Sequence, residues 1–234
     1  MIEFESKELG TIKLIGDKAE EFPMWSINRY IDETCNNYNK ILIITKICEL
    51  LQKGAVDSQF VVAKKSVMLF PKKSIKELFE YKEENYIKLA TKENNPEAFW
   101  HIIFNYSRPI VFFWKGDTFT PIIDFKDDDA IKVTSLSYNS PPLFDIFGAI
   151  ETLYDLALAG KQDEREEEAH IARQLGESAD NYRRIASASQ VINDERTPNG
   201  VRQYAMKGLE EIQEKQNILN KKLGIRIANI DKKI

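Results

Sequence analysis

The chain has little of several residue types that would mark a class of protein. Its 234 residues include only two cysteines, Cys35 and Cys48, and two histidines, His101 and His170. The cysteines fall thirteen residues apart in one predicted helix, which separates them by about 20 Å. That distance is too long for a disulfide bond. Cysteine usage therefore gives no indication of an oxidising compartment.

The sequence also lacks the common catalytic and cofactor-binding patterns. Its ten glycines form neither a Gly-x-Gly-x-x-Gly fingerprint nor a phosphate-binding P-loop. No Gly-x-Ser-x-Gly elbow and no recognised cysteine signature marks a nucleophile. Glu167 and His170 have the spacing of half a di-iron site, but the other half is missing. We therefore expect no cofactor and lean away from an enzyme.

Long hydrophobic runs and charge of one sign are absent as well. The most apolar segment, residues 143–159, contains three acidic residues and is too short to cross a bilayer comfortably. The first residues lack the basic start and apolar run of a signal peptide. Net charge is −4 for the chain and −2 on either side of residue 140, so neither half has the bulk charge of a polyanion binder. We expect a cytoplasmic protein without a membrane span.

Residues 1–139 predict an α+β domain in which a small mixed or antiparallel sheet packs with helices. Apolar residues recur at helical spacing from Ser26, the expected cap, to Gly54, the expected stop. Alternating or β-branched segments predict strands. They are residues 2–5 and 12–14, on either side of Gly10, then 60–62, 67–70, a hairpin over 110–123, and 131–138. Further helices are predicted from Ser74 toward Lys88 and from Pro96 to Tyr106.

Residues 140–234 predict a C-terminal helical region, as a bundle or an oligomerisation element. Ser140 and Pro141 are suited to open a helix over the apolar segment 143–158. The last helix has Thr197 as its expected cap, Pro198 at its first position and Gly224 just past its end. Its apolar seam consists of Ala205, Leu209, Ile212, Gln216, Leu219 and Leu223. The seam contains one polar residue and lasts fewer than three heptads, and this short length favours a packed bundle helix over a free coiled coil.

These patterns favour a non-enzymatic protein-interaction or oligomerisation module. The reason is that the helical region presents large apolar side chains that need a covering surface, and the chain lacks a catalytic constellation. The predicted interface residues, which would bury against other helices or a second subunit, are Phe144, Phe147, Ile150, Leu153, Tyr154, Leu209, Ile212 and Leu219. The expected partner is a protein or a second copy of the chain.

Two alternatives remain open at the level of the sequence. Clustered carboxylates suit hard cations, so a metal-dependent phosphodiesterase or nuclease would use Asp124, Asp127 and Asp128 of the cluster 124–129. A weak nucleic-acid binder would use the lysine-rich span 64–92. The lysines proposed for it are Lys64, Lys65, Lys72, Lys73 and Lys76. The simpler interpretation of the acidic cluster is an exposed loop between two strands. The simpler interpretation of the lysine-rich span is a set of solvated surfaces that mix lysine and glutamate.

The junction between the two regions resembles a known sequence context. Residues Ser137-Tyr-Asn-Ser-Pro141 close a predicted strand, and Gly148 follows within an apolar segment. This order resembles a loose group of uncharacterised bacterial proteins. The resemblance implies an origin in the bacterial cytoplasm and carries no activity or site residues.

Overall fold

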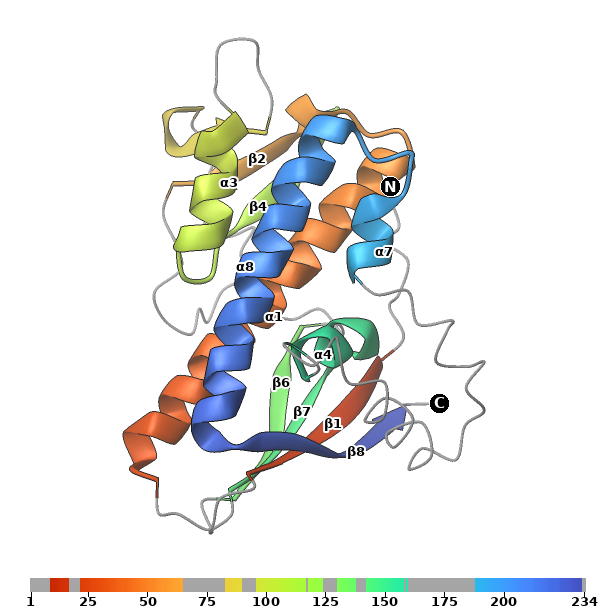
Figure 1. Cartoon of the computed structure of the whole chain (residues 1–234). Helices are drawn as coiled ribbons and strands as arrows, with labels where there is room; N and C mark the ends of the chain where they lie inside the picture. The colour runs from red at the N-terminus through yellow and green to blue at the C-terminus, as the bar shows by residue number, and fades with distance from the viewer. Residues whose placement is uncertain are drawn as a thin grey trace. The chain divides into compact units, whose positions relative to one another are not determined.

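The computed structural model describes residues 9–16, 22–64, 83–89, 96–116, 118–123, 130–137, 142–157, 159 and 188–232 (Figure 1). The chain forms two compact units. Unit 1 takes residues 1–38, 131–188 and 213–234, and unit 2 takes residues 39–130 and 189–212. Both units therefore draw on residues from either side of the predicted boundary at 139/140.

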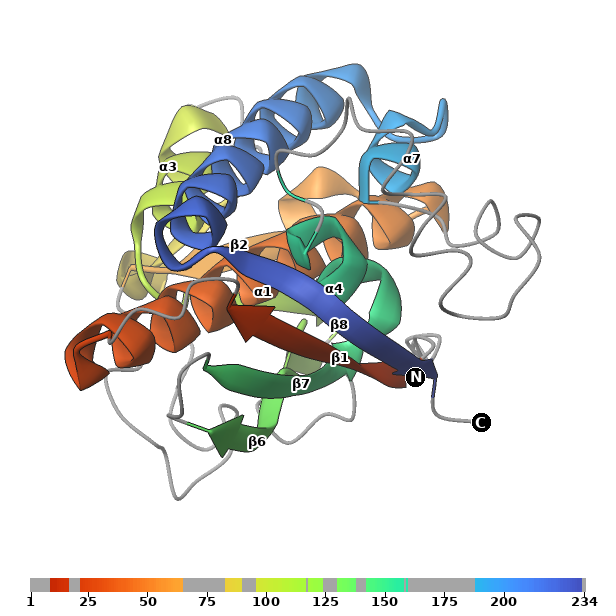
Figure 2. The same ribbon diagram turned by 60° about the horizontal axis from the view of Figure 1, so that its bottom comes forward.

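Unit 1 contains a four-stranded antiparallel sheet in the order β6-β7-β1-β8 (Figure 2). The strands are β1 (Leu9–Gly16), β6 (Lys132–Ser137), β7 (Leu143–Ala149) and β8 (Ile225–Lys232). Buried and less buried residues alternate along β1, and the register pairs Ile12 with Ile146 and Leu14 with Phe144. Because successive side chains point to opposite faces, this register gathers the apolar residues on one face of the sheet.

Helices cover the apolar side chains of the unit 1 sheet. Helix α4 (Ile150–Ala157) contacts β1 and β7. The first part of α1 (Met24–Gln52) and the last part of α8 (Asn199–Leu223) also belong to this unit. Tyr30 of α1 packs on Phe144 of β7 with ring centroids 5.5 Å apart, and both rings are buried. Burial of such rings supplies the main driving force for this core.

Unit 2 contains a second antiparallel sheet, in the order β3-β2-β4-β5. Its strands are β2 (Phe60–Ala63), β3 (Tyr86–Lys88), β4 (Val111–Lys115) and β5 (Thr118–Pro121). Short 3-10 turns, η1 (Asp57–Gln59) and η2 (Glu83–Asn85), precede β2 and β3, and helix α3 (Pro96–Asn105) contacts both of these strands. Most of the short helix α7 (Ala188–Asn193) belongs to this unit.

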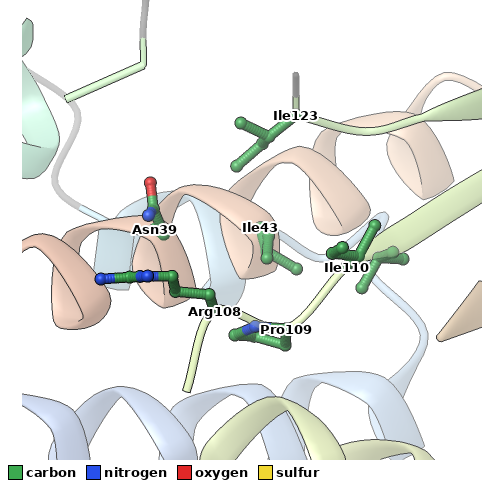
Figure 3. A pocket seen from close by; sticks show the side chains of 7 residues that line it. Asn39, Ile43, Arg108, Pro109, Ile110 and Ile123 are labelled. Atoms are coloured by element: carbon green, nitrogen blue, oxygen red, sulfur yellow. The ribbon is translucent and has the colours of Figure 1, made fainter. Parts of the chain in front are cut away.

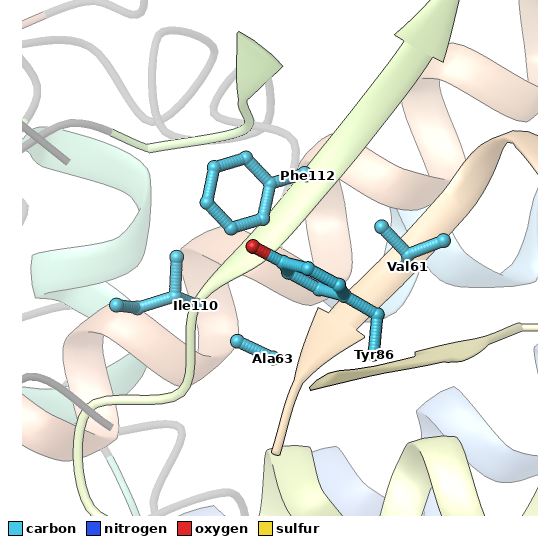
Figure 4. Packing of buried hydrophobic residues seen from close by; sticks show 5 residues of the cluster. All are labelled: Val61, Ala63, Tyr86, Ile110 and Phe112. Carbon is cyan, nitrogen blue, oxygen red and sulfur yellow. The ribbon is translucent and has the colours of Figure 1, made fainter. Parts of the chain in front are cut away.

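An aromatic cluster fills one face of the unit 2 sheet. Tyr86 packs edge-on against Phe112 at 5.7 Å, and Figure 4 shows its ring between Val61, Ala63 and Phe112. Phe119 stacks on Phe112 with centroids 4.2 Å apart. Edge-to-face and offset-stacked rings are the favoured aromatic geometries, so this sheet is held by well-packed side chains as well as by its ladder.

The two long helices end as their sequences predict. Gly54 has φ +92° and its N–H binds the Leu51 carbonyl, while the Ala55 N–H binds the Leu50 carbonyl. This pair of bonds is a Schellman motif, which needs a left-handed residue that glycine adopts at low cost. Gly224 has φ +58° and follows the last residue of α8. Both glycines therefore stop their helices.

The α+β fold class is confirmed, and several predicted elements are present within the described residues. They are the helix that ends before Gly54, strand β2, helix α3, the β4–β5 hairpin, strand β6 and helix α8. None of the described helices is both long and apolar enough to span a bilayer.

The structure corrects the prediction that residues 143–158 form one helix. Phe144 and Phe147 lie in strand β7, and the helix begins only at Ile150. The segment alternates, with Phe144 and Ile146 buried and Asp145 and Phe147 half-buried, which suits a strand. Strand β8 also follows α8, so the region after Pro141 contributes two strands as well as helices, and a purely helical bundle is not what the described residues form.

Smaller predictions need correction at element boundaries. The first helix begins at Met24, two residues before Ser26. Gly10 lies inside strand β1, and the predicted strand over residues 2–5 lies outside the described residues. Helical structure does not reach Lys88, which lies in β3. Helix α8 begins at Asn199, one residue after the predicted start at Pro198, and the carbonyl of Pro198 accepts the N–H of Arg202. The hydroxyl of Thr197, the expected cap, accepts a hydrogen bond from Gln52 Nε2 at 2.8 Å. These positions depend on tertiary partners that local sequence does not reveal.

Candidate functional site

A cavity lies in unit 1, between the first turns of α1 and the last turns of α8. Its volume is about 280 Å³. The lining side chains are Phe22, Trp25, Ser26, Arg29, Tyr30, Leu219, Lys222 and Leu223. We call this the α1/α8 cavity. It combines aromatic and aliphatic walls with two cations, which is the composition of a binding site rather than of a packing defect.

Helical spacing places these residues on one side of each helix. On α1, Arg29 follows Trp25 by four residues and Tyr30 follows Ser26 by four. On α8, Leu223 follows Leu219 by four. Residues at this spacing are neighbours on a helix surface. Tyr30 and Leu223 are buried and form the floor, while Trp25, Arg29 and Lys222 are exposed at the rim.

The first turn of α1, which contributes Trp25 to the rim, carries the most exposed large apolar side chains found in the described chain. Trp25 is 67% exposed and Met24, in the same turn, is 61% exposed. Ile218 of α8 is 44% exposed and lies one turn before Lys222. Single exposed apolar residues are ordinary, but a tryptophan and a methionine beside a concave site are typical of interfaces.

A buried polar network holds α1 and α8 together beside the cavity. Gln216 Nε2 donates to Thr34 Oγ1 at 3.0 Å and to Asn220 Oδ1 at 3.1 Å. Gln216 Oε1 accepts from Asn37 Nδ2 at 2.9 Å. The Tyr30 hydroxyl donates to Asn220 Oδ1 at 3.0 Å. Because these polar atoms satisfy one another, the network fixes how the two helices meet, and with it the floor of the cavity.

Burial also sets the charge state of the floor. Desolvation raises the pKa of Tyr30 well above its ordinary value, although hydrogen bonds from Thr34 and Gln216 oppose the shift. The phenol is therefore neutral across the physiological range and acts as a hydrogen-bond donor. The cavity consequently has a neutral floor and a cationic rim.

The two rim cations are free for an external partner as far as the structure describes the chain. Neither Arg29 nor Lys222 forms an ion pair with another described residue, whereas Arg196 pairs with Asp194 at 2.8 Å. That pair lies in the turn before α8 and holds the pKa of Asp194 down to about 2 through hydrogen bonds from Arg196. Unit 1 thus presents positive charge where its apolar cavity opens.

Unit 2 has a smaller hollow with room for about one water molecule. Asn39, Ile43, Arg108, Ile110 and Ile123 are among its lining residues, and its volume is about 10 Å³. Figure 3 shows the Arg108 side chain alongside α1 near Asn39, with the three isoleucines forming the apolar part. Arg108 has φ +50°, a left-handed conformation that is uncommon for a side-chain-bearing residue. The hollow is too small to bind a substrate.

Two lysines are buried in unit 2 and serve its packing. Lys40 Nζ donates to the Phe104 carbonyl at 2.8 Å, and Lys46 Nζ donates to the Ile122 carbonyl at 3.4 Å. Both are 4% exposed. The Phe104 carbonyl belongs to the last turn of α3, where cations are favourable to the helix dipole. These lysines tie α1 to α3 and to the strand region after β5.

Four of the eight predicted interface residues are covered by the chain itself. Phe144, Leu153, Leu209 and Ile212 are between 0% and 3% exposed, so they pack inside their own units and present no free surface. Phe147 is half-buried beneath Lys132, whose Nζ lies 5.6 Å from the ring centre.

Leu219 is the predicted interface residue that lines the α1/α8 cavity. The side chains of Ile150 and Tyr154 lie outside the described residues.

The other predicted sites fall largely outside the described residues. Asp124, Asp127 and Asp128 lie there, as do Lys65, Lys72, Lys73 and Lys76. Lys64 is exposed and its Nζ donates to the Glu84 carbonyl at 2.7 Å. Within the ranges that the structure describes, no group of three or more His, Cys, Asp or Glu is placed to hold a metal ion.

Sequence reasoning missed Trp25, Arg29 and Lys222. A signal existed in the first turns of α1, because Trp25 falls outside the apolar series Ile27, Tyr30 and Ile31. A tryptophan off the buried stripe of a helix indicates an exposed aromatic. No pattern in the sequence indicates that the end of α8 lies beside it, since Tyr30 and Asn220 are 190 residues apart.

Comparison with models of protein families, with curated proteins and with solved structures found no match.

Proposed function

We propose that this protein is a non-enzymatic protein-interaction module whose partner binds at the α1/α8 cavity. The observation that carries the proposal is the exposure of Trp25 and Met24, 67% and 61%, beside a cavity of about 280 Å³. Tryptophan and methionine are enriched at interfaces, and tryptophan is a frequent hot spot. The proposed setting is a bacterial cytoplasmic complex, which rests on the sequence alone.

The construction of the site supports binding more than chemistry. Its polar groups are one hydroxyl, a neutral phenol and two cations that lie at the rim. No general base or nucleophile-base pair is among the lining residues. The buried network under the floor holds both helices in one arrangement, and a preorganised surface loses less entropy on binding.

The proposal is tested by affinity capture with the full chain in cells of its source organism. Wild type, Trp25→Ala and Tyr106→Ala are compared. Tyr106 is 40% exposed in unit 2 and provides a matched control for loss of a surface aromatic. We expect wild type and Tyr106→Ala to retain the same protein in stoichiometric amount, and Trp25→Ala to reduce its recovery at least tenfold.

Two results contradict the proposal. One is that wild type retains no stoichiometric protein, and the other is that Trp25→Ala retains the partner as well as wild type does. Thermal melts of the three proteins control for folding, since an exposed side chain contributes little to stability. Sedimentation velocity of the purified chain identifies the case in which the retained protein is a second copy.

A further inference from the structure

We infer that the α1/α8 cavity binds an acidic peptide segment of its partner, with one large apolar side chain inside the cavity and flanking carboxylates on Arg29 and Lys222. The inference rests on the proposed function and specifies the chemistry of the partner. Three features of the cavity carry it: its volume, the placement of its charges and the composition of its walls.

The volume suits one anchoring side chain. About 280 Å³ is just below the range of about 300 to 1,000 Å³ that is usual for sites of whole small molecules. The walls that surround this space are the side chains of Phe22, Trp25, Leu219 and Leu223. Hot spots are typically single side chains that fill such pockets and leave water outside. An apolar residue of a peptide matches both the size and the lining.

The charged side chains that line the cavity are of one sign. Arg29 and Lys222 line the cavity and are exposed, and Lys221 is exposed next to Lys222. The first turn of α1 contains no acidic residue, so the positive end of that helix dipole adds to the same field. The two lysines in the last turn of α8 offset the negative end of the second helix. Carboxylates complement this arrangement, and the guanidinium of Arg29 can bind one through two parallel hydrogen bonds.

The same charges argue against the two other occupants. A second copy of the chain on a two-fold axis would bring like cations together, because such an interface pairs the same patch with itself. Single-stranded nucleic acid prefers a charged groove with open aromatic platforms. This cavity instead has aliphatic Leu219 and Leu223 among its walls, and the chain has a net charge of −4.

The test is selection from a displayed library of random twelve-residue peptides against the full chain. We expect enrichment of peptides in which a Phe, Trp or Leu is flanked by Asp or Glu. The affinity of a selected peptide is then measured for wild type and for the single variants Trp25→Ala, Arg29→Ala, Arg29→Lys, Lys222→Ala and Lys207→Ala. It is also measured for the Arg29→Ala, Lys222→Ala double variant. Lys207 is exposed on α8 outside the cavity and serves as the matched charge control.

Each variant has a distinct expected result. Trp25→Ala lowers affinity about tenfold or more because the anchor loses a wall. Arg29→Ala and Lys222→Ala each lower affinity about two- to fivefold, which is the range of exposed ion pairs. Arg29→Lys recovers part of the loss, and Lys207→Ala changes nothing. Raising the salt concentration weakens wild type more than the Arg29→Ala, Lys222→Ala double variant.

Several results overturn the inference. They are enrichment of basic or uncharged peptides, binding that is insensitive to both cation variants, and tighter binding of a twelve-nucleotide oligothymidylate than of any selected peptide. If cellular capture depends on Trp25 but one of these results is found, the interaction module stands and its acidic specificity is wrong. If capture itself fails, the proposed function is wrong whatever the peptides show.

Discussion

Units 1 and 2 share the same two long helices but hold them by different chemistry. In unit 1, α1 meets α8 through buried amides and hydroxyls centred on Gln216. In unit 2, α8 meets α3 through rings: Tyr204 of α8 stacks on Trp100 of α3 at 6.4 Å, and Trp100 stacks on Phe104 of its own helix at 5.5 Å. Directional bonds specify one arrangement, whereas close-packed rings supply more apolar burial. The binding surface that we propose lies in the unit with the directional bonds.

A glycine makes the ring contact of unit 2 possible. Gly208 lies on α8 where the Phe104 ring approaches so closely that an added Cβ would overlap it. Phe104 is 8% exposed and its ring stacks on Trp100, so the ring has little freedom to retreat. Glycine at this position lowers the intrinsic stability of the helix, and the close contact with the Phe104 ring compensates for that loss.

The largest expected effect comes from filling that position. Gly208→Ala should lower the free energy of unfolding by about 3 kcal/mol through overpacking. Gly200→Ala is the matched control, since it lies on the same helix with nothing within 4 Å of its added Cβ. Chemical denaturation measures both. If Gly208→Ala is as stable as Gly200→Ala, the close contact in unit 2 does not exist.

The matching perturbation in unit 1 is Gln216→Leu. The leucine keeps the bulk of the side chain but removes hydrogen-bonding partners from Thr34, Asn37 and Asn220, which stay buried. We expect a loss of about 2 kcal/mol, the cost of buried polar groups without partners. Gln213→Leu, at a half-buried position one turn earlier, is the control. Equal stability of the two variants would mean that the polar network does not hold the helices.

Alkaline pH should affect the two units in succession. Burial raises the pKa of Cys48 in unit 2 from 9.0 to about 12 and raises that of Tyr30 in unit 1 above its ordinary 10.0. Each group keeps its proton more firmly when folded. The corresponding stability is therefore complete below the unfolded pKa and is lost as pH rises from there toward the folded value.

This succession can be followed with single variants. The free energy of unfolding should begin to fall near pH 9, and Cys48→Val should delay that fall to near pH 10. Tyr30→Phe should leave the first part of the decline unchanged and reduce the second. Urea denaturation at steps of half a pH unit measures the profile. A decline that starts at the same pH in Cys48→Val and in wild type would contradict the assignment.

The smallest expected effect concerns Trp100. It is 1% exposed, and no described residue accepts a hydrogen bond from its Nε1. Trp100→Phe removes this buried donor together with part of a ring, and the two changes oppose each other. We expect the free energy of unfolding to change by no more than about 1 kcal/mol. Replacing a buried tryptophan by alanine usually costs about 3 to 5 kcal/mol. A larger loss would show that Nε1 has a partner such as an ordered water.

Local signals were sufficient for elements that carry their own boundaries. The β4–β5 hairpin has Gly116 in its turn at φ +57°, and α1 ends at Gln52, two residues before Gly54. The seam of α8 is also readable, because Ala205, Leu209, Ile212, Gln216 and Leu223 are all buried. In each case the periodicity and the stop residue agree, so neighbouring elements need not be known.

Elements that depend on distant partners were not predictable from local signals. The apolar residues in 143–149 are compatible with a helix or a strand. Pairing with β1 is what determines that the segment forms a strand. Strand β8 alternates from Ile225, but it needs β1 to form its ladder. The α1/α8 cavity depends on segments about 190 residues apart, as the Tyr30–Asn220 bond shows. Its rim residues carried no motif that would identify them.

The central place of β1 in its sheet has a consequence for biosynthesis. One neighbour, β8, is translated more than 200 residues after β1. At a synthesis rate of 5 to 20 residues per second, β1 waits roughly 10 to 40 s for that partner. During this interval the nascent chain presents an unpaired strand edge, which is the feature that chaperones recognise and that aggregation exploits. The sheet can therefore be completed only after β8 has been synthesised.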